Sequence, residues 1–291
     1  MHKIYNWKKF LRYVAPITIL YTMFMFVPII MAFRYSLTNY RGIGKYAFVG
    51  LDNYIRLFKA KTFYMSLTNT LKSTIVTVCL ILPLSFLCAF FLRETTKRYE
   101  VYKTIIFVPY TMGGIIIGLI WKFILNPSNG LINNLLTAVG LENLTQQWIG
   151  GKTLTPYSVG IIGVWSGLGF CTLLWISGMK QISSDIIEAS MIDGASRGQQ
   201  IRLIFIPLLK DTFKMLFVMQ FTGCLKVFET VQMLTGGGPN HYSETMVSFM
   251  YNTTFTERFF GYGMSIAVVE FVISLIITFI FLRLTKKEVT E

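Results

Sequence analysis

Residues 188–208 read EASMIDGASRGQQIRLIFIPL and lie between two long apolar stretches of the sequence. Just before them, residues 183–185 (Ser-Ser-Asp) offer helix-capping side chains, and Glu188 follows at the spacing of an Asp-x-x-Glu capping box. Asp193-Gly194 is a turn signal. Residues 196–199 (Ser-Arg-Gly-Gln) form a second capping box, opening a helix that runs to the proline near the end. We expect helix, glycine turn and helix, suited to docking a partner; an ordinary amphipathic connector is the alternative.

The composition indicates a membrane protein. Of 291 residues, 53% are hydrophobic and 14% are charged, whereas soluble domains carry about 25% charged residues. In a soluble protein the net charge of +13 would suggest nucleic acid. In this chain, the positions of the charged residues relative to the apolar stretches indicate whether the charge serves nucleic-acid binding or membrane topology.

Six charge-poor apolar stretches are each long enough to cross about 30 Å of hydrocarbon. The predicted spans are 13–36, 67–92, 104–125, 156–179, 208–233 and 262–283, with a loop at 180–207. The first exceeds the usual length of about 7–15 apolar residues in a signal peptide and lacks a small-residue cleavage site, so we expect it to stay uncleaved. The sequence therefore predicts an all-α, polytopic protein with one transmembrane domain over residues 1–291. A short amphipathic helix is expected near 131–139, in the loop after the third span.

Lysine and arginine predict the orientation of the chain. The two ends, the loop after the second span and the loop around 188–208 hold 16 of them, and the three other loops hold 7 over more residues. The positive-inside rule then places both termini and the 180–207 loop in the cytoplasm. The basic charge is a topology signal, and nucleic acid is not an expected partner.

The side chains offer no catalytic or metal centre. All four cysteines lie in apolar stretches without metal-ligand spacing, and the histidines are only His2 and His241. A phosphate-binding G-x-x-x-x-G-K-[ST] loop is absent, since residues 236–238 (three glycines) lack the following lysine. We expect no enzyme activity and no cofactor in this chain.

The loop resembles the EAA signature of permease subunits of binding-protein-dependent ATP-binding cassette (ABC) importers. The matching residues are Glu188, Ala189, Asp193, Gly194, Ala195 and Pro207, with Ser190 where the family most often has alanine. Further motifs follow the family in order: FVGLDNY at 48–54, NTL at 69–71, NPxxGLIN at 126–133, W-x-G at 165–167, KVFE at 226–229 and TGGGP at 235–239. The chain is similar to the maltose-permease-like subunit of carbohydrate-uptake importers.

This resemblance implies a type I ABC importer permease fold, half of a sugar pathway, and a coupling helix that docks on a cytoplasmic ATPase. It implies several partners: a second, related permease in a heterodimer, two ATP-binding cassette subunits that bind ATP and Mg, an extracellular or periplasmic solute-binding protein, and membrane lipid. The location would be a prokaryotic cytoplasmic (inner) membrane. The carbohydrate is not specified.

Two charged residues fall in the outer half of the fifth predicted span, where they are costly and usually functional. Lys226 and Glu229 are three apart, so one continuous helix would place them on one face. They are candidates for the substrate pathway, with a structural ion pair as the alternative. Glu270, in the sixth span, and Glu229 depart from the residues usual in such subunits.

Aromatic and small residues in the fourth span suit a sugar, whose C–H faces stack on rings. The candidates are Trp165, Gly167 and Phe170, with Cys224 of the fifth span added by resemblance; helix packing is the alternative for the aromatic rings. A secondary transporter using Glu229 and Glu270 as ion carriers would be expected to show internal repeats, and we find none. A membrane-embedded enzyme would need a catalytic cluster that the sequence lacks.

Overall fold

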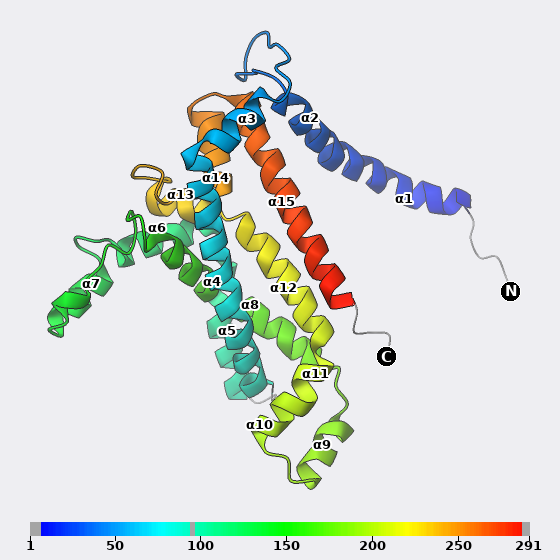
Figure 1. Ribbon diagram of the computed structural model, residues 1–291. Coiled ribbons are helices and arrows are strands. Elements are labelled where there is room, and N and C mark those ends of the chain that lie inside the picture. The colour runs from blue at the N-terminus through cyan, green and yellow to red at the C-terminus, as the bar shows by residue number, and fades with distance from the viewer. Residues whose placement is uncertain (1–6, 94–96, 287–291) are drawn as a thin grey trace. The chain divides into compact units, whose positions relative to one another are not determined.

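The computed structural model describes residues 7–93 and 97–286, and helices dominate its secondary structure (Figure 1). The α-helices are α1 (Trp7–Tyr21), α2 (Val27–Ser36), α3 (Asp52–Lys59), α4 (Lys61–Leu92), α5 (Lys97–Thr111), α6 (Gly114–Ile124), α7 (Leu131–Ala138), α8 (Thr155–Met179), α9 (Ser184–Ile192), α10 (Arg197–Gln200), α11 (Ile206–Leu208), α12 (Lys210–Leu225), α13 (Glu229–Thr235), α14 (Met246–Tyr251) and α15 (Phe260–Lys286). Three π-helical turns, η1 (Thr22–Phe26), η3 (Ile201–Phe205) and η4 (Asn252–Thr256), and one 3-10 turn, η2 (Glu142–Leu144), complete them. Over the described ranges there is no strand beyond one isolated bridge between Thr38 and Phe48. The all-α prediction is confirmed, as is the short helix near 131–139.

Four helices of the described chain are long and apolar enough to cross a membrane by themselves. They are Leu11–Ser36, Lys61–Leu92, Thr155–Met179 and Phe260–Arg283. These helices coincide with the first, second, fourth and sixth predicted spans, although the second helix begins before residue 67. The other two predicted spans are broken helices.

The third predicted span bends by 97° between α5 and α6. Gly113 at the bend has extended backbone, with φ −65° and ψ 147°. Pro109 has no N–H to continue the helical ladder, and two adjacent glycines add little helix propensity. The predicted span at 104–125 therefore corresponds to a bent pair of helices.

The fifth predicted span, 208–233, is wrong as a continuous helix. Its first part, α12, has 16 residues and ends at Leu225, and α13 begins at Glu229. Lys226 lies at the C-terminal end of α12 and Glu229 opens α13, so each charge complements the dipole of the adjacent helix end. We expected Lys226 and Glu229 to share one face of a single helix. Instead, the helix is interrupted between these two residues.

The described residues form two compact units, so the prediction of a single domain stays a prediction. Unit 1 combines the chain up to Ala60 with Phe249–Val272. In it, the Asn53 side chain donates to the backbone carbonyls of Ser36 and Thr38, both at 2.8 Å. Asn53 belongs to the FVGLDNY motif, and its bonds fix the chain between α2 and α3.

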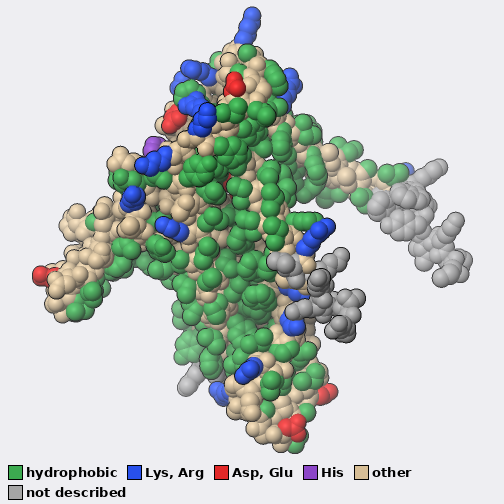
Figure 2. Space-filling model, viewed as in Figure 1, with side chains coloured by type: hydrophobic (Ala, Val, Ile, Leu, Met, Phe, Trp, Pro, Cys, Tyr) green, Lys and Arg blue, Asp and Glu red, His purple; other side chains and the backbone are tan. Residues whose placement is uncertain are grey.

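Unit 2 combines Lys61–Ser248 with the chain from Ile273 onward. One apolar cluster joins α4, α8 and α12, and Phe86 meets Trp175 edge to face at 5.2 Å. A second cluster joins α6, α8 and α13 around the buried Ile162 and Val231. Hydrophobic side chains cover much of the visible face of these helices, and charged side chains gather at the end that carries α9 and α10 (Figure 2).

Candidate functional site

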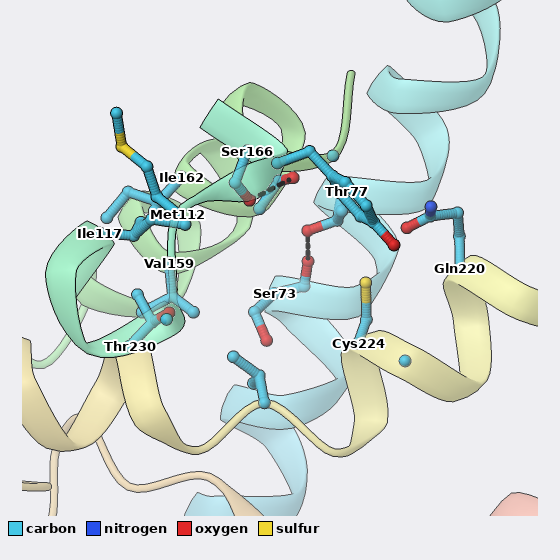
Figure 3. A pocket seen from close by; sticks show the side chains of 16 residues that line it. Ser73, Thr77, Met112, Ile117, Val159, Ile162, Ser166, Gln220, Cys224 and Thr230 are labelled. Carbon is cyan, nitrogen blue, oxygen red and sulfur yellow. Dashed lines mark hydrogen bonds between the residues drawn. The ribbon is translucent and has the colours of Figure 1, made fainter. Parts of the chain in front are cut away.

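The two helix breaks of unit 2 border a cavity of about 310 Å³. Its other walls are the unbroken helices α4 and α8. Figure 3 shows Gln220 and Cys224 of α12 near Ser73 and Thr77 of α4. The breaks leave space between the helices. They also free backbone N–H and carbonyl groups that a continuous helix would bond internally.

The cavity is lined by neutral polar groups and apolar side chains, and none of its lining residues is charged. The polar lining residues are Ser73, Thr77, Tyr110, Ser166, Gln220 and Thr230. Gln220 donates through Nε2 to Cys171 Sγ at 2.8 Å, which leaves its carbonyl oxygen available. Thr77 donates to the Gly160 carbonyl of α8 at 2.9 Å. The lining can exchange hydrogen bonds with an uncharged solute.

Lys226 and Glu229 lie at the edge of this cavity, next to its lining residues Val227 and Thr230. Both side chains are exposed in the single chain. In the part of the chain that the structure describes, no ion pair joins them. Glu229 lies against α6, because a Cβ added to Gly114 would meet its Oε2 at 2.5 Å.

The loop at 180–207 forms the expected helix, turn and helix. The cap of α9 is Ser183, whose hydroxyl accepts from the Asp185 N–H at 3.2 Å. The box predicted from Asp185 to Glu188 is therefore wrong, because Asp185 already lies inside the helix. Glu188 is exposed in the middle of α9.

Gly194 ends α9 in a left-handed conformation, with φ +74°. The N–H of Ala195 donates to the Ser190 carbonyl at 2.9 Å, and that of Gly194 to the Met191 carbonyl at 3.1 Å. This is the Schellman pattern, which glycine adopts without steric cost. The turn exposes Ile192 at 87% of its surface, so a large apolar side chain faces outward beside the acidic Asp193.

The second helix of the loop begins with the predicted capping box. The Ser196 N–H donates to Gln199 Oε1 at 2.8 Å, and the Gln199 N–H donates to Ser196 Oγ at 3.3 Å. Inside the loop, Gln200 donates to Ser190 Oγ at 3.2 Å, and both residues are buried. Ser190 stands where the family most often has alanine, and its hydroxyl links α9 to α10.

A family model described as "Binding-protein-dependent transport system inner membrane component" matches residues 81–289. The chain belongs to this family. It is a multi-pass membrane component of a transport system and not an enzyme. In this family, ATP hydrolysis belongs to partner subunits.

Curated relatives of the permease align along nearly its whole length. The trehalose/maltose transport system permease MalF of Thermococcus litoralis is 32% identical over 273 residues, covering 93% of this chain and 91% of that protein. The diacetylchitobiose uptake system permease NgcF of Streptomyces coelicolor is 30% identical, covering 95% of this chain and 82% of that protein. A probable ABC transporter permease of Bacillus subtilis, YurN, is 31% identical. That match covers 92% of this chain and 93% of YurN.

Solved structures support the same fold. A bacterial ABC transporter involved in the import of the acidic polysaccharide alginate has a chain that superposes with a TM-score of 0.84 at 21% identity. The match covers 98% of this chain and 97% of that one. A structure of bacterial alginate ABC transporter with a pentasaccharide-bound periplasmic protein gives a TM-score of 0.82. The permease thus has the ABC importer fold.

In this permease, two of the residues expected in the substrate pathway, Gly167 and Cys224, line the cavity. Phe170 stacks on Tyr110, a lining residue, with ring centroids 4.3 Å apart and planes at 4°. Trp165 packs edge to face on Trp121 at 5.6 Å within the second apolar cluster. Trp165 therefore takes part in helix packing. Phe170 does not line the cavity itself but packs on a residue of its wall.

Other lining residues were missed by reasoning from sequence. Ser73 and Thr77 lie one turn apart on α4, and Gln220 is an amide inside an apolar span. The available signal was a small-polar stripe in the second span at helical spacing. Glu270 is half-buried in α15, within unit 1.

Proposed function

We propose that this permease forms half of the path for a sugar or oligosaccharide in an ATP-driven importer. The uncharged cavity at the two helix breaks, with hydroxyl and amide groups among its apolar lining, carries the proposal. Its volume of about 310 Å³ lies at the lower end of the range of ligand pockets, about 300–1,000 Å³. Hydroxyl and amide groups with an aromatic ring suit an uncharged, polyhydroxylated solute. An ion-carrying site would be expected to hold a carboxylate among its lining residues.

Energy enters through the 180–207 loop, which docks on a separate ATPase subunit. The exposed Glu188, Ala189, Asp193 and Gly194 form the contact, with Ala195 and Pro207 fixing the turn and the second helix. ATP and Mg are bound by that subunit. The support is a rigid, capped loop that presents Ile192 outward.

One docking loop per chain implies a second, related permease, because an ABC dimer presents two docking sites. The complex would then hold two permeases, two ATPase subunits and a solute-binding protein on the opposite side, in a prokaryotic cytoplasmic membrane. Both termini and the docking loop lie in the cytoplasm, as the lysine and arginine distribution favours. The named substrates of MalF and NgcF support carbohydrate as the solute class.

Replacing Gln220 with leucine tests the cavity as the solute site. The amide is lost while the side-chain size is kept, so the solute loses one neutral hydrogen bond of about 0.5–1.5 kcal/mol. The solute concentration for half-maximal uptake is expected to rise about 3–10-fold, with unchanged assembly. Thr222→Val is the control, because its hydroxyl bonds to the Val218 carbonyl of its own helix and does not line the cavity. An unchanged concentration dependence in Gln220→Leu would exclude this cavity.

A further inference from the structure

Residues 242–246 lead from the loop after α13 into α14, and we call this segment the strap. Ser243, Glu244, Thr245 and Met246 are each at most 2% exposed. Neither apolar cluster of unit 2 includes a strap residue. Hydrogen bonds join the strap to two different walls of the cavity.

On one side the strap is bonded to α4. Asn69 donates through Nδ2 to the backbone carbonyls of Tyr242 at 2.9 Å and Glu244 at 3.0 Å. The Met246 N–H donates to Thr70 Oγ1 at 2.9 Å. Asn69 lies one helical turn before Ser73, which lines the cavity. The same buried polar face of α4 therefore anchors the strap and forms a cavity wall.

On the other side the strap is bonded to the break between α12 and α13. Thr245 donates through Oγ1 to the Val227 carbonyl at 3.0 Å. Val227 is non-helical and lines the cavity. A carbonyl freed by a helix break at membrane depth needs a hydrogen-bond donor, and Thr245 supplies one to Val227. Ser243 adds a bond of 2.6 Å to the hydroxyl of Thr235, at the end of α13.

We propose that the strap is a gate at the end of the cavity that lies away from the 180–207 loop. Asn69 and Thr245 are the positioning residues that hold this gate closed. In Figure 1, α13 lies far along unit 2 from α9 and α10. The inference rests on the proposed function, in which the solute passes through the cavity. Each hydrogen bond contributes little net free energy because water replaces it on opening. A strap held this way can open and close again within a transport cycle.

Natural cysteines allow a test of the gate. Cys224 lines the cavity, while Cys171 is fully buried beside Gln220. Each is kept as the sole cysteine of the chain, with the others changed to serine, in the complete transporter. A membrane-impermeant, positively charged methanethiosulfonate is then added to intact cells, and the rate of modification is measured.

Asn69→Leu removes both bonds to the strap while keeping the side-chain size, and Thr245→Val removes the bond to Val227. The modification rate of Cys224 is expected to rise about ten-fold or more in Asn69→Leu, which loses two bonds, and about 3–10-fold in Thr245→Val, which loses one, while Cys171 stays protected. Thr155→Val is the matched control, because its buried hydroxyl bonds to the Gly151 carbonyl, away from the strap. It is expected to leave both rates unchanged.

Three outcomes would overturn the gate. An unchanged Cys224 rate in both assembled variants would show that the strap does not control access. An equal rise at Cys171 would show general loosening, and a rise only in inverted vesicles would place the opening on the wrong side. Because modification needs no transported solute, this result is independent of whether the cargo is a carbohydrate. Failure of carbohydrate uptake would instead count against the proposed function.

Discussion

Valine in place of Gly194 is expected to reduce coupled uptake about 10–100-fold while the permease still inserts and folds. At φ +74°, a β-branched residue is strained by about 1–3 kcal/mol, which corresponds to that range. The strain falls on the turn that ends α9 and presents Ile192 and Asp193. Co-purification of the ATPase subunit should weaken in parallel with uptake.

Gly198→Val is the matched control in the same loop. Gly198 is the second residue of α10 and has no positive φ, and an added Cβ would meet nothing within 4 Å. Uptake should stay within about two-fold of normal, since valine in place of glycine changes the helix propensity by only a few tenths of a kcal/mol. Glu188→Lys reverses an exposed charge on α9 and should also uncouple. Normal uptake in both Gly194→Val and Glu188→Lys would contradict docking through this loop.

Glu229→Gln is expected to weaken uptake about 10–100-fold and to leave assembly intact. A solute hydroxyl that donates to this carboxylate makes a charge-assisted bond of about 1.5–3 kcal/mol. The structural cost of the change is smaller, because an exposed carboxylate at a helix N-terminus contributes only about 0.3–1 kcal/mol. Uptake, expression level and solute-stimulated ATPase activity separate the two effects.

The double variant Lys226→Met with Glu229→Leu distinguishes a solute site from a structural pair. If the two residues bind solute, the double variant assembles and stays inactive. If they stabilise each other, the single variants fold poorly and the double variant recovers. A double variant that assembles and transports normally would remove both residues from the pathway and leave the cavity around Gln220 to define it.

The structure of the 180–207 loop could be predicted in detail because it depends on residues that are close together in the sequence. The turn at Gly194 and the box at Ser196 and Gln199 are set by residues within five positions of one another. The first cap was misplaced because three consecutive polar residues, 183–185, all suit a cap, and only packing selects Ser183.

The cavity could not be predicted because it depends on two interruptions that hydrophobicity does not reveal. An apolar window over 208–233 looks continuous, although Lys226 and Glu229 each suit a helix end. Ser73 and Gln220 come from helices far apart in sequence, and only the packing of unit 2 brings them to one cavity. Gly167 was a candidate from the aromatic and small residues of the fourth span, and Cys224 from resemblance, without knowledge of that packing.

Uptake by the purified complex in proteoliposomes tests ATP-driven carbohydrate import most directly. The complex should contain this chain, a second permease and two ATPase subunits. A labelled oligosaccharide that binds the partner solute-binding protein should accumulate only when ATP and that binding protein are both present, and Gly194→Val should reduce the accumulation about 10–100-fold. Accumulation by this chain alone under a proton or sodium gradient, without ATPase subunits, would contradict ATP-driven import.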